Sequence, residues 1–195
     1  DSPTVTSFIV ERARRYAAVN VFPIGAITKG SEGEQLAEIG AMKGAGAVAI
    51  SDDGLPVMNS GVMRQAMRYA DSFGMTVIDH CEDLNLSAGG DIHEGERAVR
   101  LGLRGIPASS EDVMVARDVI LSEALQAKVH IAHISTRNSI EIVRHARRLG
   151  IPVSCEVTPH HFALTDAEIP DYDSNYKMKP PLRAGRDRDA ALDAL

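Results

Sequence analysis

The sequence contains no tryptophan, and aromatic residues make up only 4% of its 195 residues. A core built without large rings must be filled by Ala, Val, Ile, Leu and Met, which is typical of an α/β protein. Cysteine is also scarce, because only Cys81 and Cys155 are present. Two cysteines are too few to staple a fold of this size, which indicates a reducing, cytoplasmic setting.

An excess of positive charge and long apolar runs are missing as well. The formal net charge is -6 and the pI is about 5.6, so we expect no nucleic-acid partner. The apolar runs are strand-sized, far below the ~20 residues of a membrane helix, so we expect no membrane span. With 44% apolar and 25% charged residues, the chain has ordinary globular composition.

The length predicts one domain over residues 1–195. The chain opens at Asp1 without a Met and stops at Leu195 inside a helical pattern that starts near Arg186. We therefore expect it to be the central segment of a longer protein.

Short β-branched runs alternate with helical patterns along the chain. The expected strands are Val19–Ile24, Ala47–Ser51, Thr76–His80, Lys128–Ile134 and Pro152–Val157. The expected helices are Val5–Ala18, Gly33–Ala45, Gly61–Phe73, Glu111–Gln126 and Ser139–Leu149. Gly74 and Gly150 follow two of these helices, where a left-handed cap is expected. This alternation predicts βαβ units and a parallel sheet.

The strand starts are separated by 28, 29, 52 and 24 residues. One βα unit of an eight-unit barrel takes ~30 residues, so the spacing is that of a barrel with one long insertion. The insertion is the polar, Gly-rich stretch 83–110. Loops that follow the carboxyl ends of strands hold the chemistry of α/β enzymes, although a surface excursion without a role is the alternative.

Polar residues gather where three of the expected strands end. The motifs are Ser51-Asp52-Asp53-Gly54, Asp79-His80-Cys81-Glu82-Asp83 and His130-Ile131-Ala132-His133-Ile134-Ser135-Thr136. Each motif also has a purely structural interpretation, because Asp-Asp-Gly favours turns and a single His is often a hydrogen-bonded structural group. Their recurrence in successive units instead favours convergence on one face, where a carboxylate and two imidazoles suit a metal such as zinc.

Strand alternation narrows the choice within each motif. His130 and His133 point to opposite faces, and His133, nearer the carboxyl end, is the better ligand. Asp52 and Asp53 also face opposite ways, and spacing alone does not choose between them.

Other reactive side chains have structural interpretations. We expect His93 and His145 to be solvated and Cys81 to lie in the helix layer. For His160 and His161, which follow the last strand, a structural role is at least as plausible as an approach to the site. The Lys177–Arg183 run reads as a rigid loop with a potential anion contact.

Together these motifs resemble those of bacterial zinc-dependent dihydroorotases of the larger type, in the amidohydrolase superfamily. The resemblance rests on GAITKG at 25–30, SDDG at 51–54, DHCED at 79–83, GIPASSEDVMVARD at 105–118, HIAHIST at 130–136, CEVTPHH at 155–161 and KMKPPLR at 177–183. It covers essentially the whole chain, in order and with compatible spacings.

The resemblance implies a (β/α)8 TIM barrel of which this chain holds roughly strands 3 to 7. It implies metal ligands at Asp53, His80 and His133, with two Zn2+ ions per complete subunit. The implied reaction interconverts dihydroorotate and N-carbamoyl-aspartate in pyrimidine synthesis. The implied partners are a second copy of the chain, as a homodimer, or aspartate carbamoyltransferase.

Two departures from the family pattern matter. The family's H-x-H ligand pair and its base, an Asp on the eighth strand, lie outside residues 1–195, so no catalytic residue falls within this chain. We therefore expect the segment alone to be inactive. Where the family usually has a substrate-contacting Asn, this sequence has Lys179.

Two rival functions remain. The first is another cyclic-amide hydrolase, an allantoinase or a hydantoinase. These enzymes usually carry a carboxylated Lys where this chain has Asp53, which argues against them. The second is a non-catalytic dihydroorotase-like subunit that only supports a partner enzyme. Such subunits lose metal ligands, whereas the three expected in this chain are intact.

Overall fold

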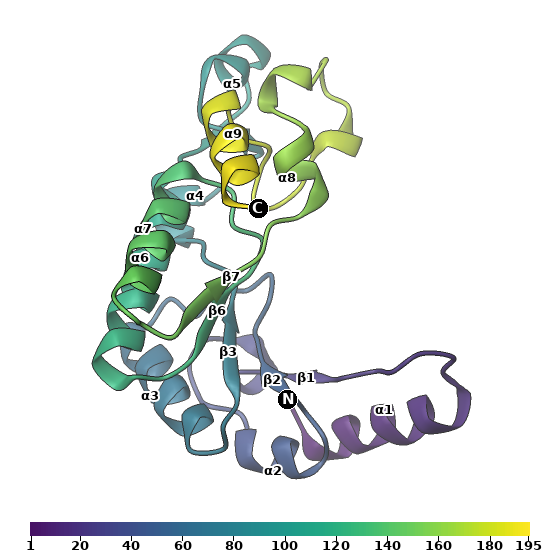
Figure 1. Cartoon of the computed structure of the whole chain (residues 1–195). Coiled ribbons are helices and arrows are strands. Elements are labelled where there is room, and N and C mark those ends of the chain that lie inside the picture. The colour runs from purple at the N-terminus through teal and green to yellow at the C-terminus, as the bar shows by residue number, and fades with distance from the viewer. The chain divides into compact units, whose positions relative to one another are not determined.

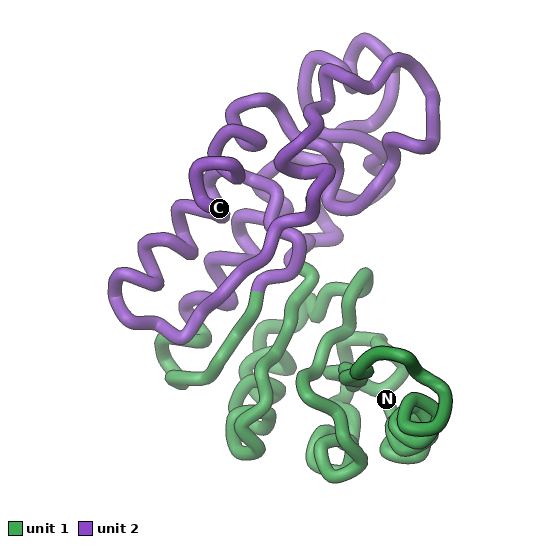
Figure 2. The backbone as a smooth tube through the Cα atoms, turned by 45° about the vertical axis from the view of Figure 1, so that its right-hand side comes forward, with its two compact units in different colours: residues 1–80, 121–130 green, residues 81–120, 131–195 purple.

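The computed structural model describes residues 1–195 and divides into two compact units. Unit 1 comprises residues 1–80 and 121–130, and unit 2 comprises residues 81–120 and 131–195 (Figure 2). Helix α6 (Ser109–Leu125) and strand β6 (Val129–Ile131) each run from one unit into the other. The single-domain organisation inferred from chain length remains a prediction.

Unit 1 alternates helices with short strands (Figure 1). Its elements are α1 (Pro3–Tyr16), β1 (Ile24–Gly25), the 3-10 turn η1 (Lys29–Ser31), α2 (Ile39–Gly44), β2 (Ala49–Ile50), α3 (Ser60–Asp71) and β3 (Thr76–Asp79). Strand β2 lies between β1 and β3, and both pairings are parallel. The Val77 N–H donates to the Lys128 carbonyl at 3.3 Å, which brings the start of β6 beside β3.

Unit 2 holds the end of β6 and a second, smaller sheet. Its elements are α4 (Leu84–Ser87), β4 (Ile92–His93), α5 (Glu96–Leu101), β5 (Gly105–Ile106), α7 (Arg137–Arg148), β7 (Val153–Cys155), α8 (Pro159–Ala163), η2 (Asp166–Glu168), η3 (Ser174–Tyr176) and α9 (Gly185–Ala194). The Glu156 N–H donates to the Ile131 carbonyl at 3.1 Å, next to β7. The main sheet therefore has the order β1-β2-β3-β6-β7.

Two helices show why the sequence predicted their ends well. The Asn59 side chain caps α3 by accepting hydrogen bonds from the Gly61 and Val62 N–H groups. Thr136 caps α7 in the same way through the Ser139 N–H. Both helices bury one stripe at helical spacing, Met63, Ala66, Met67 and Ala70 in α3 and Ser139, Ile140, Val143 and Ala146 in α7. Gly74 and Gly150, which follow them, have positive φ as predicted.

Two expected elements differ from the prediction. Of the expected strand Val19–Ile24, only Ile24 belongs to β1, which lies at the end of the strand order and pairs only with β2. The helix expected over Gly33–Ala45 begins at Ile39. Residues before it pair with the chain after β1 instead, because the Ala37 N–H donates to the Ile27 carbonyl at 2.9 Å.

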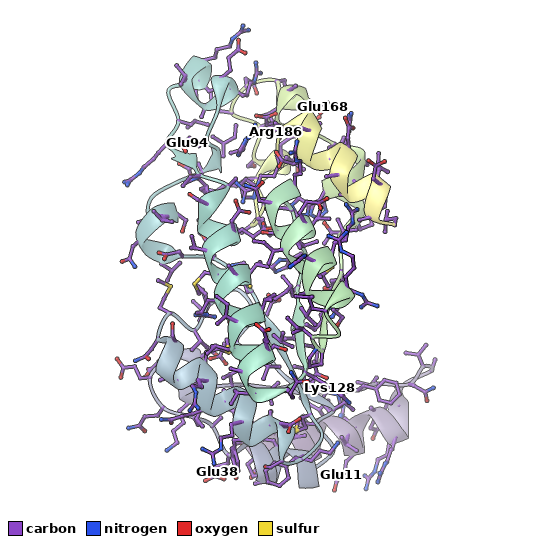
Figure 3. The ribbon with its side chains drawn as sticks, turned by 60° about the vertical axis from the view of Figure 1, so that its left-hand side comes forward. Glu11, Glu38, Glu94, Lys128, Glu168 and Arg186 are labelled. Atoms are coloured by element: carbon purple, nitrogen blue, oxygen red, sulfur yellow. The ribbon has the colours of Figure 1, made fainter.

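The stretch 83–110 is a folded substructure. Strands β4 and β5 pair in parallel, and Ile92, Ala98, Ile169 and Leu182 form a buried apolar cluster beside them. Gly105 is required at this contact, because a Cβ there would lie 2.5 Å from the Cα of Glu94, which Figure 3 labels. The prediction that His93 is solvated is wrong, since only 5% of it is exposed. His145 is exposed, as expected.

Candidate metal and substrate site

The SDDG motif is a turn whose two carboxylates have different surroundings. The Leu55 N–H donates to the Asp52 carbonyl at 2.8 Å, and Gly54 has a φ of 82°. The buried Asp52 carboxylate accepts the Ile27 N–H at 2.8 Å and both the N–H and the hydroxyl of Thr28. Asp52 therefore ties the segment after β1 to the end of β2.

Asp53 lies on the open side of this turn and faces His80. Its side chain is 64% exposed, whereas the His80 side chain, directly after β3, is 3% exposed. His80 Nδ1 and Asp53 Oδ1 are 3.7 Å apart. Two ligand atoms that share one tetrahedral zinc at 2.0–2.2 Å are about 3.5 Å apart, so this pair has a spacing that fits a shared ion. The structure thus brings Asp53 next to His80, whereas Asp52 is bonded to the backbone after β1, and a metal-binding role for Asp53 stays a prediction.

His133 belongs to unit 2, and its predicted convergence with Asp53 and His80 on one metal stays a prediction. It follows β6 in a turn and has a φ of 35°, in the left-handed region that residues with a Cβ seldom adopt. A residue held in this conformation at a strand end is a common feature of functional sites.

The loop after His133 is held by a buried ion pair. The Glu111 carboxylate accepts the N–H groups of Ser135 and Thr136 at 2.9 and 3.0 Å. Arg183 Nη2 lies 3.6 Å from the same carboxylate, and both side chains are 3% exposed. The Arg183 guanidinium also donates to the Ser135 hydroxyl and the Ile106 carbonyl and contacts the His93 ring. Arg183 was predicted only as part of a loop with an anion contact, and the residues it contacts are 48 to 90 positions away in sequence.

Desolvation lowers the pKa of His93, and the neighbouring Arg183 charge lowers it further. Neutral His93 can therefore accept a hydrogen bond from the guanidinium, although their 3.3 Å separation makes this a weak one. This explains how a histidine inside a polar stretch is buried.

Two further imidazoles, His160 and His161, follow β7 and lie in unit 2. Burial lowers the pKa of His161 to about 4, and the His160 and His133 imidazoles act in the same direction. Desolvation also lowers the pKa of His160, with a contribution from His133. Both imidazoles are accordingly neutral at physiological pH. The structural role given as one alternative for His161 agrees with its bond to the Pro180 carbonyl at 2.9 Å.

Lys179 lies just before Pro180, and the peptide bond between them is cis. Its ammonium donates to Glu82 Oε1 at 2.9 Å, and its side chain is 47% exposed against 9% for Glu82. A half-exposed ammonium retains donors for an anionic ligand, because one carboxylate oxygen uses only one of its three N–H groups.

The two cysteines are free thiols. Buried Cys81 contacts Asp118 of α6, with its Sγ 3.6 Å from Oδ2, so it lies against the helix layer as expected. Burial raises the pKa of the Cys155 thiol. The Cys155 thiol therefore lacks the lowered pKa of a catalytic cysteine. None of the helices has the length and apolar character needed to cross a membrane.

Solved structures of a hydantoinase and a dihydropyrimidinase share the fold of this chain. L-hydantoinase from Arthrobacter aurescens is 19% identical with a TM-score of 0.75, over 97% of this chain and 43% of that protein. Dihydropyrimidinase from Brevibacillus agri is 17% identical with a TM-score of 0.75, over 98% and 44% respectively. The chain therefore has the α/β fold of part of these structures, in agreement with the predicted incomplete barrel.

The sequence comparisons are more specific. A dihydroorotase from Solibacter usitatus is 67% identical and one from Pelotomaculum thermopropionicum is 56% identical, each over the whole of this chain. The chain spans 45% of the length of either relative. The family described as "Dihydro-orotase-like" matches residues 2–139. The chain thus belongs to the dihydroorotase-like family.

Proposed function

We propose that the protein containing this chain is a dihydroorotase, which interconverts dihydroorotate and N-carbamoyl-aspartate. The observation that carries the proposal is the Asp53–His80 pair at two adjacent strand ends, in a chain 67% identical to a dihydroorotase. The hydantoinase structures, at 17–24% identity, support only the fold. They give no reason to prefer a hydantoinase.

The ligands we assign to zinc are Asp53, His80 and His133. A carboxylate and neutral imidazoles are a donor set that zinc prefers, and the 3.7 Å spacing of the first two fits it. When bound, zinc supplies Lewis-acid polarisation of the scissile carbonyl and hydroxide at neutral pH. Two ions per complete subunit is the stoichiometry we propose.

The residues of this chain have distinct tasks in the reaction. Asp53 offsets cationic charge with a carboxylate that remains accessible to solvent. His80 is buried, and we propose that the packing around it keeps its ring in place as substrate exchanges. Lys179 binds the carboxylate that both dihydroorotate and N-carbamoyl-aspartate carry. The proton transfers fall to a base outside residues 1–195.

The two free thiols agree with a reducing compartment, and we propose that the reaction takes place in the cytoplasm. The partners we propose are a second copy of the protein or aspartate carbamoyltransferase.

The test is turnover and metal content of the full-length protein. We expect it to hydrolyse dihydroorotate and to contain zinc. His80→Ala and His133→Ala should each lose zinc and lower kcat/KM by at least about a hundredfold. His145→Ala, on the exposed face of α7, is the matched control and should retain both. Turnover of hydantoin or allantoin in place of dihydroorotate would reassign the substrate. Zinc-free protein without any turnover would instead favour the non-catalytic subunit.

A further inference from the structure

Four groups in unit 2 form a continuous chain of hydrogen bonds that ends at His160. His161 Nε2 lies 2.9 Å from the carbonyl oxygen of Pro180. His161 Nδ1 lies 2.6 Å from the Thr158 hydroxyl, and the same hydroxyl lies 2.8 Å from His160 Nε2. The Thr158 side chain makes no capping bond to α8, so the two imidazoles are its hydrogen-bond partners.

The chemistry of these groups determines every proton in the chain. A carbonyl oxygen only accepts, so His161 Nε2 carries a proton and donates to Pro180. Because His161 is buried and its pKa is about 4, it is neutral and its Nδ1 has no proton. The single Thr158 proton must therefore point to His161 Nδ1. The Thr158 oxygen can then only accept from His160, so His160 Nε2 also carries a proton.

One atom is left with an unused lone pair. Neutral His160 with a proton on Nε2 has a bare Nδ1, and no side chain or backbone group of this structure bonds to that nitrogen. His160 is partly exposed to solvent, so it does not lie in the buried core. His160 can thus accept a hydrogen bond at Nδ1 and can donate none there.

His160 also lies at the same sheet edge as His133. Thr158 follows β7 and His133 follows β6, and the Ile134 N–H donates to the Glu156 carbonyl at 2.8 Å between the two segments. The carboxyl ends of neighbouring parallel strands meet on one face, which is where barrel enzymes bind substrate. The influence of His133 on the pKa of His160 agrees with this proximity.

We infer that His160 is a substrate-contacting residue whose Nδ1 accepts a hydrogen bond from a ring N–H of a cyclic ureide, in a tautomer set by Thr158, His161 and the Pro180 carbonyl. This inference rests on the proposed function for its substrate class. A neutral acceptor suits an N–H donor and cannot hold a carboxylate, which has no proton to give. His160 and Lys179 therefore select different parts of one substrate.

The first test reads the tautomer in the full-length protein by long-range 1H–15N correlation of the histidine rings, with His160 assigned from the spectrum of His160→Asn. We expect a protonated Nε2 and a bare Nδ1 at neutral pH. Thr158→Val should release this preference while leaving the fold intact. Addition of dihydroorotate or hydantoin should shift the Nδ1 resonance. A proton on Nδ1, or no shift with either ureide, would overturn the inference.

The second test compares two variants of His160 in turnover. Asn places an amide oxygen near the position of Nδ1, whereas Gln reaches only the position of Nε2 and keeps the Thr158 contact. We expect His160→Gln to lose about tenfold more kcat/KM than His160→Asn, as for one hydrogen bond. A structural role predicts the reverse order, because Gln preserves the packing contact. If the wild type lacks turnover, the proposed function fails while the tautomer and the ureide shift still decide this inference.

Discussion

The Arg183 guanidinium and the Glu111 carboxylate face each other 3.6 Å apart, and each side chain is 97% buried. Glu111 lies in the first turn of α6 and binds the loop after His133, while Arg183 contacts His93. One ion pair thus connects the helix, the ligand loop and the folded insertion within unit 2.

We expect Arg183→Met to lower the free energy of unfolding of the full-length protein by about 3–5 kcal/mol, since it leaves the Glu111 carboxylate buried without its cation. Denaturant unfolding measures this. Arg100→Met is the matched control, because Arg100 pairs with Glu96 on the exposed surface of α5 and should change stability by less than about 0.5 kcal/mol. Equal effects of the two variants would show that the buried pair is dispensable.

Substitutions of the two neighbouring carboxylates of the SDDG turn should have different effects, one on stability and the other on metal binding. We expect Asp52→Ala to destabilise the protein by about 2–4 kcal/mol, because it leaves the Ile27 and Thr28 donors without an acceptor. Asp53→Ala should leave stability of the metal-free protein nearly unchanged, since the side chain is 64% exposed, yet remove bound zinc. Denaturant unfolding of the metal-free variants checks the two stability changes, and metal analysis checks the loss of zinc. Retention of zinc by Asp53→Ala would exclude Asp53 as a ligand.

The strand-end motifs were accessible from sequence because a parallel sheet places every carboxyl end on one face. That rule located His80 and the Asp52-Asp53 pair, and the family resemblance chose Asp53, whose carboxylate lies 3.7 Å from His80 in the structure. It gave no information on His93 or on the tautomer of His160. Arg183 is 90 positions from His93, and the Pro180 carbonyl that sets the tautomer is 19 positions from its partner His161, and only tertiary packing brings such groups together. The polar composition of the stretch 83–110 therefore led to the wrong prediction that His93 is exposed to solvent.

Burial of His161 predicts a loss of stability in acid. The pKa of His161 is about 4 in the folded protein, against 6.5 for an ordinary histidine. Between these values the unfolded chain binds a proton that the folded chain does not, so the free energy of unfolding falls as the pH is lowered through this window. The loss from His161 is on the order of 3 kcal/mol, and His93 acts in the same direction.

We expect His161→Gln to flatten the pH dependence of unfolding between about pH 6.5 and pH 4, at the cost of lower stability at neutral pH. Denaturant titrations at several pH values measure the slope. His145→Gln removes an exposed histidine from α7 and should leave the slope unchanged. An identical slope in wild type and His161→Gln would mean that folding does not lower the pKa of His161.

Lys179 should contribute to binding of the substrate carboxylate rather than to stability. We expect Lys179→Met in the full-length protein to raise KM for dihydroorotate about tenfold with a smaller change in kcat, because a charged hydrogen bond to the ground state and transition state alike is lost. Lys177→Met is the control, since Lys177 lies two residues earlier and pairs with Asp91 at 2.5 Å. If neither variant changes KM, Lys179 does not bind the substrate and only forms its ion pair with Glu82. A KM restored by Lys179→Arg would establish that the positive charge is what the substrate needs.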